Sequence, residues 1–109
     1  MKIMGYFGHR KNGKAIVTKH FLDNNNDAKQ EKLKNYNDKI NHSTDFEWGY
    51  YGSGPSQLAF CILFDFTKDY KFSSYHYQLF KEKYIGKYKE EWIITREELN
   101  SFIHVAKYV

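Results

Sequence analysis

Cysteine, proline and arginine are scarce in this sequence of 109 residues. The single cysteine, Cys61, has no partner for an internal disulfide, so the chain suits a reducing, cytoplasmic compartment. Because Cys61 lies in an apolar run, we expect it to be a buried small hydrophobe rather than a nucleophile. Arginine, the usual bidentate reader of phosphate, occurs only as Arg10 and Arg96, which weakens the case for nucleic-acid binding.

Long apolar runs are also missing. The longest, residues 58–64, is much shorter than the roughly 20 residues that a membrane-spanning helix needs. Residues 1–9 lack the apolar stretch of a signal peptide. We therefore expect neither a membrane segment nor a membrane partner.

Aromatic residues, in contrast, are abundant, with ten tyrosines and nine phenylalanines. A few of them fill a small core, and the surplus favours a half-exposed contact surface that also permits a homo-oligomer. Compositional drift in an AT-rich genome explains the same excess without any function. The net charge of +4 favours an anionic partner, but the lysines are interleaved with acids, as on an ordinary solvated surface.

The N-terminal residues predict a β-hairpin. Residues 3–10 suit a strand, the Asn12-Gly13 pair favours a type I′ turn, and residues 15–18 return as the second strand. Phe21 and Leu22 extend this strand or begin a short third one.

Residues 23–41 are polar and rich in asparagine. Leu33, Tyr36 and Ile40 fall at helical spacing, so a short amphipathic helix is one interpretation. We favour the other, a polar loop.

A buried helix follows in the middle of the chain. Nearly every residue from 58 to 66 is apolar, and a helix that is apolar on all sides is a buried one. Proline is preferred at the first helical position, so we expect the helix to begin near Pro55 with Ser53 or Gly54 as its N-cap. Strands are expected on one side of it and helices on the other.

Two further helices complete the chain. Ser73 or Ser74 is expected to cap a helix that ends near Ile85, where Gly86 is a suitable stop. The last helix has apolar residues at helical spacing, namely Leu99, Phe102, Ile103 and Ala106.

A strand is expected just before the last helix. Residues 91–95 suit a strand, which must pair with the hairpin because its backbone groups need partners. Thr95 and Glu98 have the spacing of a capping box, which ends the strand and starts the helix. We therefore expect residues 1–109 to form a single α+β domain, with a small, mainly antiparallel sheet packed on the buried central helix and two further helices.

The glycine-rich loop before the central helix is the main candidate site. Such a loop directs free N–H groups at one spot, where the helix dipole favours a phosphate or carboxylate. Nearby hydroxyl, amide and aromatic side chains can add hydrogen bonds and stack on a base. The loop lacks the P-loop and dinucleotide motifs, and a purely structural turn requires the same glycines. The candidate ligand-binding residues are Trp48, Tyr50, Tyr51, Gly52, Ser53, Gly54, Ser56 and Gln57.

Other polar residues give weaker candidates. His42, Asp45 and Glu47 are close in sequence but match no metal-ligand or acid–base spacing, and we expect Glu47 to accept N–H groups of the loop backbone. Residues 81–89 interleave lysine with tyrosine and are the best nucleic-acid candidate, although a solvated helix face explains them as well.

Six strings resemble the domain-of-unknown-function 6166 family, a small family found in bacteria and their phages. They are Phe46-Glu47-Trp48-Gly49-Tyr50, Gly52-Ser53-Gly54-Pro55, Gln57-Leu58-Ala59, Tyr77-Gln78, Phe80-Lys81 and Glu91-Trp92-Ile93-Ile94. Tyr51 departs from the pattern, because a smaller residue is expected there. The family has no assigned activity, so the resemblance leaves the function open. It implies a phage or mobile-element origin. By analogy with other small phage proteins alone, it implies a role in binding and blocking a target.

We therefore expect a non-enzymatic, cytoplasmic binding module without cofactor, metal or catalytic residue. Its expected partner is an anionic, nucleotide-like small molecule, such as a host immune signal, or a host protein. Two alternatives stay open. One is a nucleic-acid-binding or protein-docking accessory protein that uses the lysine- and tyrosine-rich surface, and the other is an enzyme acting on a nucleotide with Glu47 or His42.

Overall fold

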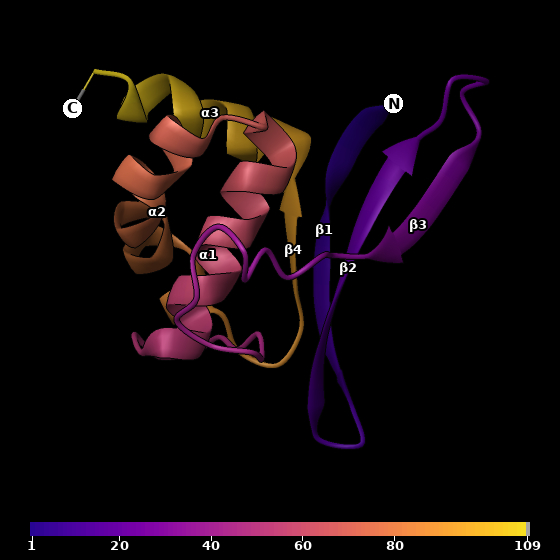
Figure 1. The fold of residues 1–109 in the computed structure, drawn as a ribbon. Helices are drawn as coiled ribbons and strands as arrows, with labels where there is room; N and C mark the ends of the chain where they lie inside the picture. Colours follow the sequence, from indigo (N-terminus) through magenta and orange to yellow (C-terminus); the bar gives the residue numbers. More distant parts are fainter. Residues whose placement is uncertain (109) are drawn as a thin grey trace.

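The computed structural model describes residues 1–108. An antiparallel sheet with the strand order β3-β2-β1-β4 carries all the α-helices on one face (Figure 1). The strands are β1 (Lys2–Lys11), β2 (Lys14–Leu22), β3 (Ala28–Lys32) and β4 (Trp92–Thr95), and the helices are α1 (Ser53–Thr67), α2 (Tyr70–Lys83), the short 3-10 helix η1 (Ile85–Lys87) and α3 (Arg96–Ala106). This is the α+β architecture that the sequence predicts.

The hairpin of β1 and β2 is confirmed. Asn12 and Gly13 both have positive φ angles, 52° and 78°, as a type I′ turn requires. Of the two interpretations of Phe21 and Leu22, extension of the second strand is confirmed, and Leu22 pairs with Lys2. On its other side, β1 pairs with β4, so the late strand returns to the hairpin as predicted.

The prediction of a loop over residues 23–41 is wrong for β3, which pairs with β2 along its whole length. Asp23 organises the connecting turn, because its Oδ1 accepts hydrogen bonds from the N–H groups of Asn25 and Asp27. All of β3 is exposed, so its side chains lack the alternation of apolar and polar residues that reveals a strand in a sequence. Backbone pairing with β2, rather than burial, holds it in place.

Helix α1 is the centre of the molecule, between the sheet and α2 (Figure 1). The side chains of residues 58–63 are completely buried, as predicted for an apolar helix. The helix begins earlier than expected, with Gly52 as its N-cap, so Pro55 occupies the third helical position. Proline is tolerated there because the N–H groups of the first turn have no partner inside the helix. Within residues 1–108, no helix has both the length and the apolar character needed to cross a membrane.

The start of α2 also differs from the prediction. Asp69, not Ser73 or Ser74, is the N-cap, and its Oδ1 accepts the N–H of Phe72 at 3.0 Å. This early start is possible because Lys68 adopts a left-handed conformation that ends α1 and turns the chain at once. The helix ends at Lys83, before the predicted limit, and η1 follows it.

The start of α3 is confirmed in detail. Thr95 Oγ1 accepts the N–H of Glu98, and Glu98 Oε1 accepts the N–H of Thr95, each at 3.1 Å. This capping box places Leu99, Phe102 and Ala106 on the buried side of the helix.

The observed cap of α2 predicts the effect of two substitutions. Asp69→Ala is expected to lower the free energy of unfolding by about 1 kcal/mol, because one N–H of the first turn loses its partner. Ser74→Ala should change it by less than about 0.5 kcal/mol, because the Ser74 hydroxyl bonds only the exposed carbonyl of Lys71. Urea titrations of both variants test this, and an equal or larger loss in Ser74→Ala would restore the predicted cap.

Candidate functional site

The glycines of the candidate loop allow two tyrosine rings to pack closely. A Cβ on Gly52 would approach the Tyr50 ring to 2.7 Å, and a Cβ on Gly86 would collide with the Tyr51 ring. Gly49 has a φ of 89° and donates its N–H to the carbonyl of Ile85 at 3.1 Å. The loop therefore needs its glycines for conformation and packing, whether or not a ligand binds.

Part of the predicted site lies inside the protein. The buried Trp48 donates its Nε1–H to the carbonyl of Lys89 at 2.6 Å. Gln57 is fully buried and ties the preceding segment to α1. Its Oε1 accepts the His42 N–H at 2.8 Å, and its Nε2 donates to Asn35 Oδ1 and the Ile40 carbonyl. These two side chains support the loop from below and do not face solvent.

The first turn of α1 contains two more buried candidates. Gly54 lies under Tyr50 and Glu47, because its Cβ would come within 3.3 Å of the Tyr50 hydroxyl and 2.7 Å of Glu47 Cβ. Ser56 donates its hydroxyl to the carbonyl of Gly52 at 3.0 Å. Both residues shape the turn rather than project from it.

The remaining candidates form an exposed surface at the start of α1. Tyr50 and Tyr51 are 50% and 54% exposed, and Ser53 is exposed as well. Within residues 1–108 the N–H groups of Ser53 and Gly54 make no hydrogen bond, and Gly52 offers no side-chain cap. The turn therefore keeps the unpaired donors that a helix N-terminus presents to an anion.

Lys81 adds a cation to this surface. Its Nζ donates to the carbonyl of Tyr51 at 3.2 Å and to Ser56 Oγ at 3.1 Å. Among the described residues it has no carboxylate within ion-pair distance. Sequence reasoning placed Lys81 in a separate basic stretch, because only the packing of α2 on α1 brings it to the loop.

Glu47 does not hold the loop through backbone N–H groups, as the sequence had suggested. Its two carboxylate oxygens accept from the Arg10 guanidinium at 2.8 and 3.2 Å, and Arg10 lies over the Trp48 ring at 4.5 Å. The hydrogen bond to Glu47 raises the pKa of Arg10. Glu47 and Arg10 thus fasten the loop to β1.

The acids and histidine near the loop do not converge. His42 Nε2 lies 2.7 Å from the Tyr77 hydroxyl, and Glu47 pairs with Arg10, whereas Asp45 bonds Ser43 through its backbone N–H and carbonyl. Among residues 1–108 no group of three or more His, Cys, Asp or Glu side chains is placed to hold a metal ion.

The tyrosines of residues 81–89 pack inward. The Tyr88 ring stacks on Trp92 with ring centroids 4.6 Å apart, and Tyr84 packs on Phe80. Burial raises the pKa of the Tyr88 hydroxyl. Both rings are only partly exposed and pack on neighbouring aromatic rings, so this stretch contributes mainly its lysines to the surface.

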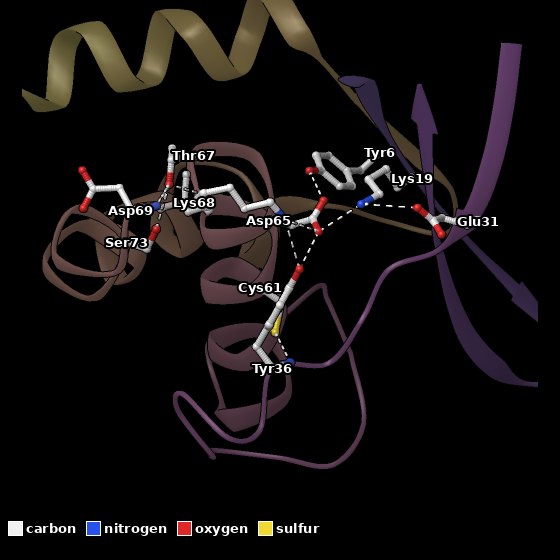
Figure 2. Close-up of polar contacts among 11 residues, drawn as sticks. Tyr6, Lys19, Glu31, Tyr36, Cys61, Asp65, Thr67, Lys68, Asp69 and Ser73 are labelled. Carbon is white, nitrogen blue, oxygen red and sulfur yellow. Dashed lines mark hydrogen bonds and ion pairs between the residues drawn. The ribbon is translucent and has the colours of Figure 1, made fainter. Parts of the chain in front are cut away.

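The core contains a polar cluster that was not predicted from the sequence (Figure 2). Asp65 is only 1% exposed, and its carboxylate accepts hydrogen bonds from the hydroxyls of Tyr6 and Tyr36, both at 2.7 Å. Lys19 Nζ lies 3.1 Å from Asp65 Oδ1, and Lys68 Nζ lies 3.4 Å from the same oxygen. The signal was present, because a single acid in an otherwise apolar helix must find partners in the core.

The pKa shifts in this cluster do not suit acid–base catalysis near neutral pH. Burial alone would raise the pKa of Asp65, but hydrogen bonds from Tyr6, Tyr36 and Lys19 outweigh it and lower the pKa. Burial and the bond to Asp65 raise the pKa of both tyrosines. A general base near neutral pH needs a raised carboxylate pKa, so the cluster acts as a structural tie.

Comparison with known proteins gives a family and no activity. The model of a family described as "Family of unknown function (DUF6166)" matches residues 6–105. The chain belongs to this family. The DUF6166 match runs from β1 into α3 and includes both the loop and the Asp65 cluster. No curated protein and no solved structure matches the chain. Function in this DUF6166 protein must therefore be argued from geometry.

Cys61 takes part in the core of this DUF6166 protein, as expected of a buried small hydrophobe. Its Sγ accepts the backbone N–H of Tyr36 at 3.3 Å. Burial outweighs that hydrogen bond and raises the pKa of the thiol to about 11, so it stays protonated at neutral pH.

The lowered pKa of Asp65 predicts how stability changes with pH. The folded-state pKa lies below the unfolded value of about 3.9, so the stabilisation is complete above about pH 5 and is lost as the pH falls through the folded pKa. Asp65→Asn leaves Lys19 buried without its ion-pair partner in α1 and should cost about 3 kcal/mol near pH 7. The deficit should narrow below about pH 4.

Urea titrations of the wild-type protein and of Asp65→Asn across this pH range measure the effect. Asp38→Asn is the matched control, because Asp38 is exposed and forms no ion pair in the described residues. A deficit that stays constant with pH would contradict the proposed linkage.

Proposed function

We propose that this DUF6166 protein is a non-enzymatic binding module for a small, nucleotide-like anion, held at the exposed first turn of α1. The observation that carries the proposal is the uncapped start of this helix beside Lys81. Helix N-termini favour anions because their free N–H groups and the helix dipole act in the same direction.

The chemistry of the turn suits a phosphate. The Ser53 N–H and hydroxyl are exposed donors, and the Lys81 ammonium lies on the adjacent surface of α2. Lys81 is held by neutral oxygens only, so an anion gains a cation without displacing a carboxylate.

The aromatic part of the proposed contact is Tyr50 and Tyr51. Both rings are half-exposed and border the turn, so either can stack on a base attached to the phosphate. The Tyr51 ring packs against Gly86, where the absence of a side chain leaves room for it. Trp48, Gly54, Ser56 and Gln57 support this surface from within, and Gly52 leaves the helix uncapped.

The biological version of the proposal rests on the family resemblance. In a phage-encoded chain, a cytoplasmic protein with such a site would sequester a host nucleotide signal. A host protein that presents a phosphate or carboxylate is the other partner with matching chemistry.

Calorimetric titration with linear and cyclic nucleotides tests the proposal, together with mass spectrometry of any molecule that the purified protein carries. Lys81→Gln should weaken nucleotide binding about tenfold, because a hydrogen bond to a charged group is lost. Tyr50→Ala should weaken it to a similar degree by removing a stacking surface.

Lys83→Gln is the matched control. Lys83 is exposed on the same helix and forms no ion pair within residues 1–108, so its replacement should leave the affinity unchanged. Absence of heat with every nucleotide and absence of a co-purifying ligand would overturn the proposal. Equal effects of Lys81→Gln and Lys83→Gln would overturn the assignment of the site.

A further inference from the structure

The second face of the sheet has no covering element among residues 1–108. All helices lie against one face, and β1, β2 and β3 are open on the other (Figure 1). Tyr6, Val17 and Lys19 point into the core, so the alternation of side chains along each strand turns their neighbours outward. We call the outward side of the four strands the open face.

Half-buried aromatic side chains and the exposed Ile93 occupy the centre of the open face. Phe7 and His9 on β1 stack with ring centroids 5.1 Å apart and an angle of 15° between their planes. His20 on β2 meets Phe7 edge-on at 6.4 Å. Ile93 on β4 pairs with Phe7 and is 61% exposed, which is unusual for an isoleucine in a sheet.

The centre of this face is also hollowed. A depression of about 380 Å³ lies between β1, β2 and β4, and its size is in the range of small-molecule sites. Its lining is mostly apolar and consists of Met4, Gly5, Tyr6, Phe7, His20 and Ile93. A flat aromatic group such as a base finds both a cavity and ring edges here.

Lysines surround this apolar centre. Alternation and cross-strand register place four of them on the open face, one near each end of β1, one at the start of β2 and one at the end of β3: Lys2, Lys11, Lys14 and Lys32. The only acid within the four strands is Glu31, which turns the other way and lies 3.5 Å from Lys19. Glu91 borders one corner, just before β4.

We propose that the open face binds single-stranded nucleic acid. The centre supplies aromatic and apolar surface for unpaired bases, and the surrounding lysines supply positive charge for the phosphate backbone, which is the combination that single-strand binding requires. Four-stranded sheets with exposed aromatic residues on central strands are an established platform for single-stranded RNA.

The charge pattern favours this occupant over a second copy of the chain. Two open faces packed together would bring their lysines close to one another with no strand acid to compensate. A duplex keeps its bases stacked inside, so it reaches the lysines but leaves the aromatic centre unused. The open face and the first turn of α1 lie on opposite sides of the sheet. Binding of nucleic acid to the open face is therefore independent of the proposed anion binding at α1, and either can be tested without the other.

Fluorescence anisotropy with labelled oligothymidylate and oligouridylate of about 15 nucleotides tests the proposal. Both are expected to bind at about 50 mM salt and more weakly at about 200 mM. The logarithm of the affinity should fall with the logarithm of the salt concentration with a slope of about −3, if all four lysines contact phosphates. Comparison of the two oligonucleotides distinguishes DNA from RNA as the preferred form.

Variants separate the two parts of the face. Phe7→Ala and His20→Ala should each weaken binding about tenfold, whereas Tyr75→Ala, which removes an exposed ring from α2, should not. Lys32→Gln should make the salt slope shallower by about 0.7, whereas Lys71→Gln on α2 should leave it unchanged. Lys81→Gln should have no effect here.

Three results would overturn the proposal. The first is the absence of binding to both oligonucleotides at low salt. The second is equal affinity for a duplex of the same length, or binding that Phe7→Ala leaves unchanged, because either would mean that the aromatic centre is not used. The third is a dimer, detected by light scattering, that Phe7→Ala dissociates, since it would assign the face to a second copy.

Discussion

The buried carboxylate of Asp65 is the constraint on which the two layers of this protein depend. A charged group in the core is tolerated only when its neighbours satisfy it, and here these come from β1, β2 and the segment that follows β3. Tyr6, Lys19 and Tyr36 must therefore all lie at one point of α1 (Figure 2). This fixes which side of the sheet faces the helices, and so also which side is left open.

The glycine-rich loop shows how one stretch can combine packing with recognition. Its interior half, with Trp48 and Gln57, is committed to hydrogen bonds that position the start of α1. Its exterior half, with Tyr50, Tyr51 and Ser53, is exposed to solvent. A rigid turn with unpaired donors loses little conformational entropy when it meets an anion.

The fold could be predicted where local chemistry decides it. The Asn12-Gly13 turn, the apolar run in α1 and the capping box of Thr95 each carry their own signal. The strand β3 could not be predicted, because it is exposed throughout and depends on pairing with β2. Within the candidate site, the residue types of the loop were found, but burial divides them into supporting and exposed groups. Lys81 joins them only through the packing of α2 on α1.

The exposed strand β3 makes one edge of the sheet independent of the core. It contributes no buried side chain, so its detachment would expose little apolar surface and lose mainly backbone hydrogen bonds. Such a segment opens with a free energy well below that of global unfolding. The sheet thus has a buried centre at β1 and an exposed border at β3, whose detachment would also break the ion pair between Glu31 and Lys19. When β3 is detached, the outer edge of β2 becomes an accessible template for an added strand.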